Sequence, residues 1–206
     1  IMNISTFSGS LRRGEWIRDI WSWLFLLVMV LFFEIWAQVI YSSSFLFNGF
    51  NVQSILIFAT APLLLGIGQS LVIISGGIDL SVGFVMGLSA VVLATVVQSF
   101  SGEAHGLALA IGILITFLVC LIPGLINGLL VTKLKVPPFI GTLGMYGVAR
   151  GSGFIIADGM TVPVDNDWLY KLGTGKILGI PIVVLIVIVV VIIFHFILSQ
   201  TKFGQY

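Results

Sequence analysis

Six apolar runs, each long enough to cross a lipid bilayer as a helix, dominate this sequence. A hydrocarbon core roughly 30 Å thick requires about 20 residues of α-helix. Only 8% of the 206 residues are charged, against about 25% in soluble domains, so the chain cannot build a water-facing surface. We therefore predict an all-α, polytopic transmembrane helix bundle. The predicted spans are Trp21–Tyr41, Gln53–Ser75, Leu80–Gln98, Gly106–Thr132, Val136–Ile156 and Ile177–Leu198.

The positive charges between the runs predict the orientation of the bundle. With six spans both chain ends lie on one side, and Lys and Arg gather on the cytoplasmic side of membrane proteins. We therefore expect both ends to be cytoplasmic, with residues 1–20 as a cytoplasmic or interfacial segment, 21–198 as the transmembrane domain and 199–206 as the start of a cytoplasmic loop. The predicted inner side carries Arg12, Arg13, Arg18, Lys133, Lys135 and Lys202, and the outer side carries Lys171 and Lys176.

Composition and missing motifs exclude several classes of protein. A net charge of +1 argues against a nucleic-acid-binding domain, which needs clustered basic charge. The single cysteine, Cys120, lies in an apolar run, so neither a disulfide framework nor a thiolate metal site is expected. The sequence contains no P-loop and no His/Glu set with metal-ligand spacing. We expect no catalytic residues, no metal and no cofactor.

Polar side chains inside the apolar runs are the candidate functional residues, because each is costly in lipid unless it is paired or hydrated. For Glu34 and Arg150, both a structural role and a place on a solute pathway are open, and Asn127 is expected to bond to a neighbouring helix. The residues selected as lining of a translocation path, or as an intramembrane polar network, are Glu34, Gln69, Asp79, Asn127, Thr142, Tyr146 and Arg150.

The segment Ile74–Gly83, with the sequence ISGGIDLSVG, predicts a sharp turn between two spans. Its two adjacent glycines permit a tight backbone bend, and Asp79 and Ser81 are both suitable N-caps for the helix that follows. We also consider the hypothesis that Asp79 forms an ion pair with Arg150, which would hold the turn against the fifth span.

Glycines at intervals of four residues predict close helix packing, since such pairs let two backbones approach each other. On the fifth run, a glycine stripe and the polar stripe of Thr142, Tyr146 and Arg150 lie on different sides of the helix. The residues alone thus indicate a tight bundle around a polar route, more typical of a transporter than of a scaffold. The pairs are Gly83/Gly87, Gly124/Gly128 and Gly147/Gly151.

Three segments resemble ribose-type sugar ABC transporter permeases: Gly76–Gly83 (GGIDLSVG), Pro123–Val131 (PGLINGLLV) and Val136–Gly144 (VPPFIGTLG). The resemblance runs from about Ile55 to the C-terminus. It implies an inner-membrane permease subunit of a binding-protein-dependent importer, carrying a monosaccharide. The implied partners are ATP-binding subunits, an extracytoplasmic sugar-binding protein, a second permease copy and the lipid bilayer.

The resemblance also implies that Lys202, Phe203 and Gly204 begin the cytoplasmic loop that contacts the ATP-binding subunit. Because family members continue beyond this loop into further spans, we expect the sequence to be about the first two thirds of a permease. Three alternatives stay open. They are a permease of the same superfamily for branched-chain amino acids or nucleosides, a stand-alone secondary carrier that couples Glu34 or Asp79 to protons, and a membrane scaffold.

Overall fold

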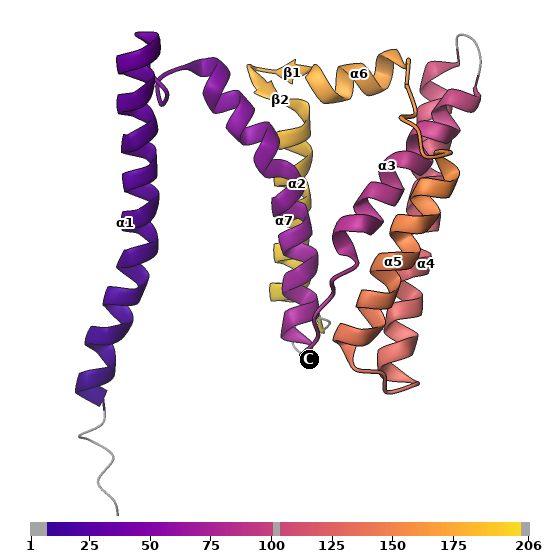
Figure 1. Cartoon of the computed structure of the whole chain (residues 1–206), viewed down its shortest axis with the longest axis horizontal. Coiled ribbons are helices and arrows are strands. Elements are labelled where there is room, and N and C mark those ends of the chain that lie inside the picture. Colours follow the sequence, from indigo (N-terminus) through magenta and orange to yellow (C-terminus); the bar gives the residue numbers. More distant parts are fainter. Residues whose placement is uncertain (1–7, 101–103, 203–206) are drawn as a thin grey trace, which may run out of the picture. The chain divides into compact units, whose positions relative to one another are not determined.

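The computed structural model of the chain describes residues 8–100 and 104–202, with side chains from Ile20 onward in these ranges. Within them the chain forms helices and one short β-hairpin (Figure 1). The helices are α1 (Ser8–Tyr41), α2 (Gly49–Ile74), α3 (Val82–Ser99), α4 (His105–Thr132), α5 (Pro138–Ile156), α6 (Asp167–Thr174) and α7 (Ile182–Gln200), and the strands are β1 (Lys176–Ile177) and β2 (Ile180–Pro181).

A long helix occupies each of the six ranges predicted as spans, which confirms an all-α, polytopic membrane protein. Among the described residues, five helices are long and apolar enough to cross a membrane: α1 over Ile20–Tyr41, α2, α3, α4 and α7. The exception is α5, whose 19 residues include five glycines and Arg150. Its role as the sixth span, and the cytoplasmic placement of both ends that depends on it, stay predictions.

The boundary expected at residue 20 does not interrupt the backbone, because α1 is one continuous helix from Ser8. The side chains before Ile20 lie outside the described residues, so an interfacial role for residues 1–20 stays a prediction.

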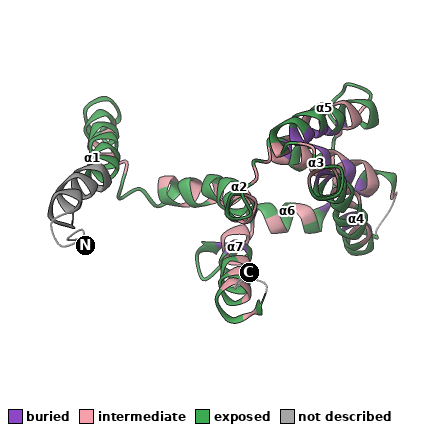
Figure 2. Cartoon of the chain, turned by 90° about the horizontal axis from the view of Figure 1, so that it is seen from below, coloured by how far each residue is buried: buried purple, intermediate pink, exposed green. Residues whose placement is uncertain are grey.

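The chain divides into two compact units, Ile1–Leu56 and Ile57–Tyr206. In the second unit, α3 packs against both α4 and α5, and the buried residues gather there (Figure 2). Leu88 and Val92 from α3 meet Ala149 from α5 in the centre of this core. Gly153 allows the close approach, since a Cβ at this position would lie 3.7 Å from the Cα of Leu88. The three helices form a small frame that positions the polar residues described below.

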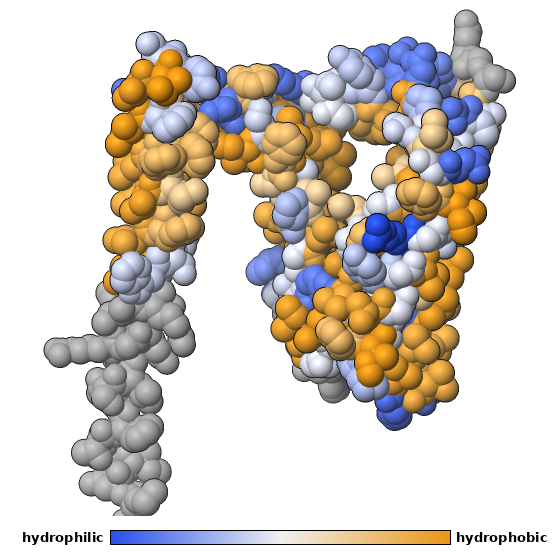
Figure 3. Space-filling model, viewed as in Figure 1, coloured by the Kyte–Doolittle hydropathy of each residue, from blue (hydrophilic) through white to orange (hydrophobic). Residues whose placement is uncertain are grey.

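Apolar side chains cover the outer surfaces of the helices (Figure 3). None of the apolar window of α1 or α2 is buried inside the chain, and Trp23, Val39 and Phe58 are 70%, 73% and 80% exposed. Patches of this extent are stable only against lipid or another protein. The surface therefore agrees with a chain that uses the bilayer as its solvent.

The last span begins later than predicted. Residues from Ile177 to Pro181 form a hairpin instead of the first turn of a helix, with Ile177 paired to Ile180. Leu178 and Gly179 have φ values of 51° and 82°, as a type I′ turn requires. Helix α7 then starts directly after Pro181. The turn chemistry of Leu178-Gly179 thus overrides the apolar pattern.

Candidate functional site

A non-helical segment, residues 75–81, joins α2 to α3 and is the centre of the candidate site (Figure 1). Helix α2 ends in a Schellman motif: Gly77 N–H donates to Val72 O and Gly76 N–H donates to Ile73 O, both at 2.9 Å. Gly76 has a φ of 79°, which glycine adopts without strain. The sharp turn predicted from the two glycines is confirmed.

Side chains from three helices hold this segment. Gln69 of α2 donates a hydrogen bond to the carbonyl of Asp79. Thr142 of α5 donates to the carbonyl of Ile78 at 3.1 Å, and the amide of Asn127 on α4 donates to Ser81 Oγ at 3.1 Å. Four of the seven predicted polar residues, Gln69, Asp79, Asn127 and Thr142, therefore gather around one stretch of backbone.

Asp79 closes a local turn at the start of α3. Its Oδ1 accepts hydrogen bonds from Ser81 N–H at 2.7 Å and from Ser81 Oγ at 2.6 Å. Ser81 occupies the N-cap position, but its side chain makes no capping bond to the helix. The capping bond expected from Ser81 is therefore absent, whereas Asp79 accepts from a backbone N–H at the start of α3, as an N-cap side chain does. Ser81 Oγ in turn accepts the bond from Asn127.

Three of the polar side chains in this region are deeply buried, and Gln69 and Asp79 are partly buried. Ser81, Thr142 and Asn127 are 1%, 4% and 7% exposed. Asn127 has an unsatisfied acceptor, because its Oδ1 is buried and has no hydrogen-bond partner among the described residues. A buried unsatisfied acceptor is uncommon in native proteins and points to water, a ligand or another chain.

A hollow of about 420 Å³ lies beside this segment, and we call it the Asp79 hollow. Asp79 is the only charged residue among those that line it. The lining residues are Val72, Ser75, Gly76, Gly77, Ile78, Asp79, Gly124, Asn127, Gly128, Val131, Thr132, Pro138 and Thr142.

Arg150 does not pair with Asp79, so the ion-pair hypothesis is wrong. The Arg150 guanidinium lies 5.6 Å from the centre of the Phe84 ring, and Tyr146 meets the same ring edge-on, with ring centres 4.2 Å apart. Thr142 contacts the segment at Ile78, and Arg150 is two helical turns further along α5, about 12 Å by helical rise. The stripe of Thr142, Tyr146 and Arg150 thus faces the start of α3.

The predicted glycine pairs do not bring helices together within the described chain. A Cβ built at any of them would have no atom within 4 Å. The close approaches occur at other glycines, such as Gly112, where a Cβ would lie 2.9 Å from Leu93. The spacing of glycines did not identify which face meets a neighbour. The six open positions are Gly83, Gly87, Gly124, Gly128, Gly147 and Gly151.

Glu34 has a separate set of partners in the first unit. Its carboxylate accepts hydrogen bonds from Gln38 Nε2 at 2.8 Å, from Ser44 Oγ at 3.0 and 3.2 Å, and from the N–H groups of Phe45 and Leu46 at 2.8 Å each. The loop after α1 therefore folds back onto the helix, where Phe45 also stacks on Phe33. Glu34 accepts the hydrogen bonds of the loop donors and holds the loop against α1, so its polar partners are all local.

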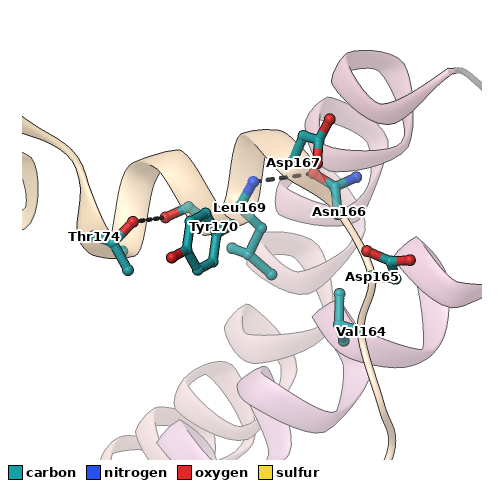
Figure 4. A pocket seen from close by; sticks show the side chains of 8 residues that line it. Val164, Asp165, Asn166, Asp167, Leu169, Tyr170 and Thr174 are labelled. Atoms are coloured by element: carbon teal, nitrogen blue, oxygen red, sulfur yellow. Dashed lines mark hydrogen bonds between the residues drawn. The ribbon is translucent and has the colours of Figure 1, made fainter.

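The sequence analysis missed a short amphipathic helix, α6, and its anchor. Asn166 caps α6 by accepting from the N–H groups of Trp168 and Leu169 at 3.1 and 3.0 Å, and its amide donates to the carbonyl of His105 at 2.9 Å. Figure 4 shows the cap beside a hollow of about 350 Å³ lined by Asp165, Asp167 and neighbouring residues. An Asn followed by Asp-Trp-Leu is an N-cap signal that the sequence did carry.

Lys202 is exposed just beyond the end of α7. Phe203 and Gly204, which the sequence analysis placed with it, lie outside the described residues. Within the described ranges, no three His, Cys, Asp or Glu side chains are grouped so that they could hold a metal ion.

Comparisons with known proteins place this chain among transport proteins. A family model described as the permease component of branched-chain amino acid transport systems matches residues 51–206. The Autoinducer 2 import system permease protein LsrC of Photorhabdus luminescens is 33% identical over 159 residues, which cover 76% of this chain and 46% of the relative.

Two further relatives are named for sugars. The ribose import permease protein RbsC of Haemophilus influenzae is 31% identical over 160 residues, 76% of this chain and 48% of the relative. The galactofuranose transporter permease protein YtfT of Escherichia coli is 34% identical over 143 residues, 69% of this chain and 40% of the relative.

The chain spans less than half the length of each of these relatives. No solved structure matches it. The family match covers more than half of the chain, and it includes the segment between α2 and α3 together with the helices that hold it. The chain is a multi-pass protein of the inner membrane, and it belongs to the family of transport-system permease components.

Proposed function

We propose that this chain provides the translocation path of an ABC importer for a monosaccharide. The observation that carries the proposal is the convergence of polar side chains from α2, α4 and α5, those of α4 and α5 buried, on the break between α2 and α3 in an otherwise apolar bundle. Irregular backbone at membrane depth is tolerated where it is buried in protein or lines a water-filled cavity. Relatives named for ribose, galactofuranose and L-arabinose support a sugar as the solute.

The importer would need partners for energy and for solute capture. ATP-binding subunits would act from the cytoplasm, near the loop that starts at Lys202, and a second permease copy would complete the path. An extracytoplasmic sugar-binding protein would dock on the side of α6 and the hairpin. The excess of Lys and Arg on the opposite side supports this orientation.

A second candidate is a permease of the same kind for branched-chain amino acids, which the description of the family model favours. Its solutes carry both an ammonium and a carboxylate group. The lining of the Asp79 hollow contains one carboxylate and no cationic side chain, so it offers no charged partner for a solute carboxylate. The sugar proposal therefore fits the described residues better.

Uptake by membrane vesicles tests the proposal. The vesicles contain this protein together with the ATP-binding and solute-binding proteins of the same transport system, and they receive labelled D-ribose, L-arabinose or L-leucine. We expect ATP-dependent uptake of a sugar, with L-leucine excluded. Uptake of L-leucine alone would support the second candidate, and sugar uptake without the ATP-binding subunits would identify a secondary carrier.

A further inference from the structure

The backbone that lines the Asp79 hollow has hydrogen-bonding capacity that the chain does not use. Among the described residues, the N–H groups of Ile78 and Asp79 and the carbonyls of Gly76 and Gly77 have no hydrogen-bond partner. The second carboxylate oxygen of Asp79 is also without one, because both bonds from Ser81 go to Oδ1. The residues that line the hollow therefore carry both donors and acceptors that no described residue uses.

This segment also lies below the end of the neighbouring helix. Ser81 bonds to Asn127, which stands five residues before Thr132 at the end of α4, about 8 Å by helical rise. Unpaired backbone groups at such a depth are stable when they line a water-filled cavity. A solute with hydroxyl groups could take the place of such water and bind the same unpaired backbone groups.

Two glycines make the space. Gly124 and Gly128 line the Asp79 hollow, and a Cβ at either would meet nothing within 4 Å. The predicted small-residue pair on α4 therefore faces the hollow and not another helix of the described chain. The volume of about 420 Å³ lies within the range of roughly 300–1,000 Å³ that small-molecule sites occupy.

Asn127 supplies an independent indication of a ligand. It lines the hollow, is 93% buried, and keeps a buried Oδ1 without a partner among the described residues. Its amide already donates to Ser81, so its remaining need is for a donor. No described residue supplies a donor to Asn127 Oδ1.

We propose that the Asp79 hollow is a binding site for a small uncharged polyhydroxylated solute. A hydroxyl group both donates and accepts hydrogen bonds, which matches the N–H groups of Ile78 and Asp79 on one hand and the Asp79 carboxylate and the glycine carbonyls on the other. A lone carboxylate disfavours anionic solutes. The inference rests on the proposed function and adds to it the place where the solute is held.

Protection of an engineered cysteine from a water-soluble thiol reagent tests the site. Cys120→Ala first removes the native thiol, and Thr132→Cys then places a thiol in the lining of the hollow. In membrane vesicles we expect the reagent to modify this thiol. D-ribose should slow the reaction roughly fivefold at four times its dissociation constant, because the fraction of empty sites is 1/(1 + [L]/Kd). Met160→Cys, an exposed position in the loop after α5 and outside the lining of the hollow, reports whether D-ribose alters the reagent itself.

A matched pair of glycine variants provides the control. Gly128→Leu adds a side chain in the lining of the hollow, and Gly147→Leu adds the same side chain at a glycine that does not line it; a Cβ at either position meets nothing within 4 Å. We expect the protection by D-ribose to be lost in the first variant and kept in the second. Both variants should elute in detergent like the parent protein.

Four results would overturn the proposal: no modification of the thiol at 132, no slowing by D-ribose, L-arabinose or D-galactose, slowing by choline in place of the sugars, or full protection in Gly128→Leu. If ATP-dependent sugar uptake persists without any protection, this site is wrong and the proposed function stands. If protection is observed without uptake, the site is supported and the importer proposal fails.

Discussion

Two carboxylates in this molecule, Glu34 and Asp79, are held in opposite ways. Every partner of Glu34 lies within 12 residues of it, and both of its oxygens accept hydrogen bonds. Asp79 has one oxygen bonded to Ser81, and the groups around it come from three helices, with Thr142 reaching Ile78 from 64 positions away. One cluster is local and complete, and the other is long-range and incomplete.

The difference separates a structural role from a solute-binding one. A carboxylate whose hydrogen bonds all come from its own helix and the loop that follows it, as those of Glu34 do, has little acceptor capacity left for a solute. The residues that line the Asp79 hollow carry free N–H groups, a free carboxylate oxygen and an unsatisfied amide oxygen, and these groups can bind a solute. Both carboxylates lie next to long apolar helices, Glu34 within α1 and Asp79 in the break between α2 and α3, so their hydrogen-bond partners are what separates the two roles.

The largest effect on stability is expected from Ser81→Ala. Ser81 links Asp79 to Asn127 and is 1% exposed. Loss of its hydroxyl removes both of these bonds and leaves the buried amide group of Asn127 without a partner, while Asp79 keeps the bond from the N–H of residue 81. We expect a loss of about 1–3 kcal/mol in the free energy of unfolding in detergent. Ser70→Ala is the control, because exposed Ser70 bonds only to Gly66 of its own helix, and it should change stability by less than about 0.5 kcal/mol. Equal losses of stability in Ser81→Ala and Ser70→Ala would contradict a structural role for the hydrogen bonds between Asp79, Ser81 and Asn127.

The second effect concerns the loop after α1. Glu34→Leu removes all the acceptors that hold Ser44, Phe45 and Leu46, so the loop should open. We expect a cysteine at Leu46 to react roughly tenfold faster with a thiol reagent, since charge-assisted hydrogen bonds are the strong ones. Gln38→Leu removes a single bond and should have a smaller effect. An unchanged rate in Glu34→Leu would contradict the anchoring role.

A double-mutant cycle tests the separation of Asp79 from Arg150. The structure gives them no shared partner, because Asp79 bonds to Ser81 and Arg150 lies over Phe84. The free-energy effects of Asp79→Asn and Arg150→Gln on the uptake rate should therefore add within about 0.5 kcal/mol. A double variant no worse than either single variant would restore the ion pair that the structure excludes.

The smallest effect is expected at Phe84. Phe84→Leu removes the ring that Arg150 covers and that Tyr146 meets edge-on. Each contact is worth roughly 0.5–1 kcal/mol, so thermal unfolding in detergent should shift by a few degrees at most. Phe58→Leu, at a position 80% exposed, is the control. If the thermal unfolding temperature of Phe84→Leu alone fell much further, the Phe84 ring would contribute more to the packing of α5 against α3 than these two contacts account for.

The sequence predicted which residues form the polar site better than it predicted which residues they contact. Gln69, Asp79, Asn127 and Thr142 could be selected because polar side chains are costly in lipid, and the adjacent glycines predicted the break between α2 and α3. The partner of Asp79 could not be predicted, since opposite charges suggest Arg150 whereas a bond to Ser81, two residues away, forms through local backbone geometry.

Helix faces and short elements were also beyond the sequence. Glycine spacing shows that one face of a helix is flat, but only the packing shows that Gly124 and Gly128 open onto a hollow. The start of α7 was misplaced because the turn at Leu178-Gly179 lies inside an apolar stretch. The position of a hairpin as short as this one depends on the φ values of its two turn residues and not on the average hydropathy of the segment.

The most direct test of the account measures both clusters in the same membranes. Cysteines at Ser43, in the lining of a hollow beside the Glu34 loop, and at Thr132, in the Asp79 hollow, are modified with one water-soluble reagent, with and without D-ribose. The account predicts modification at both positions and protection by D-ribose at 132 alone. Protection at both positions, or at 43 alone, would contradict it.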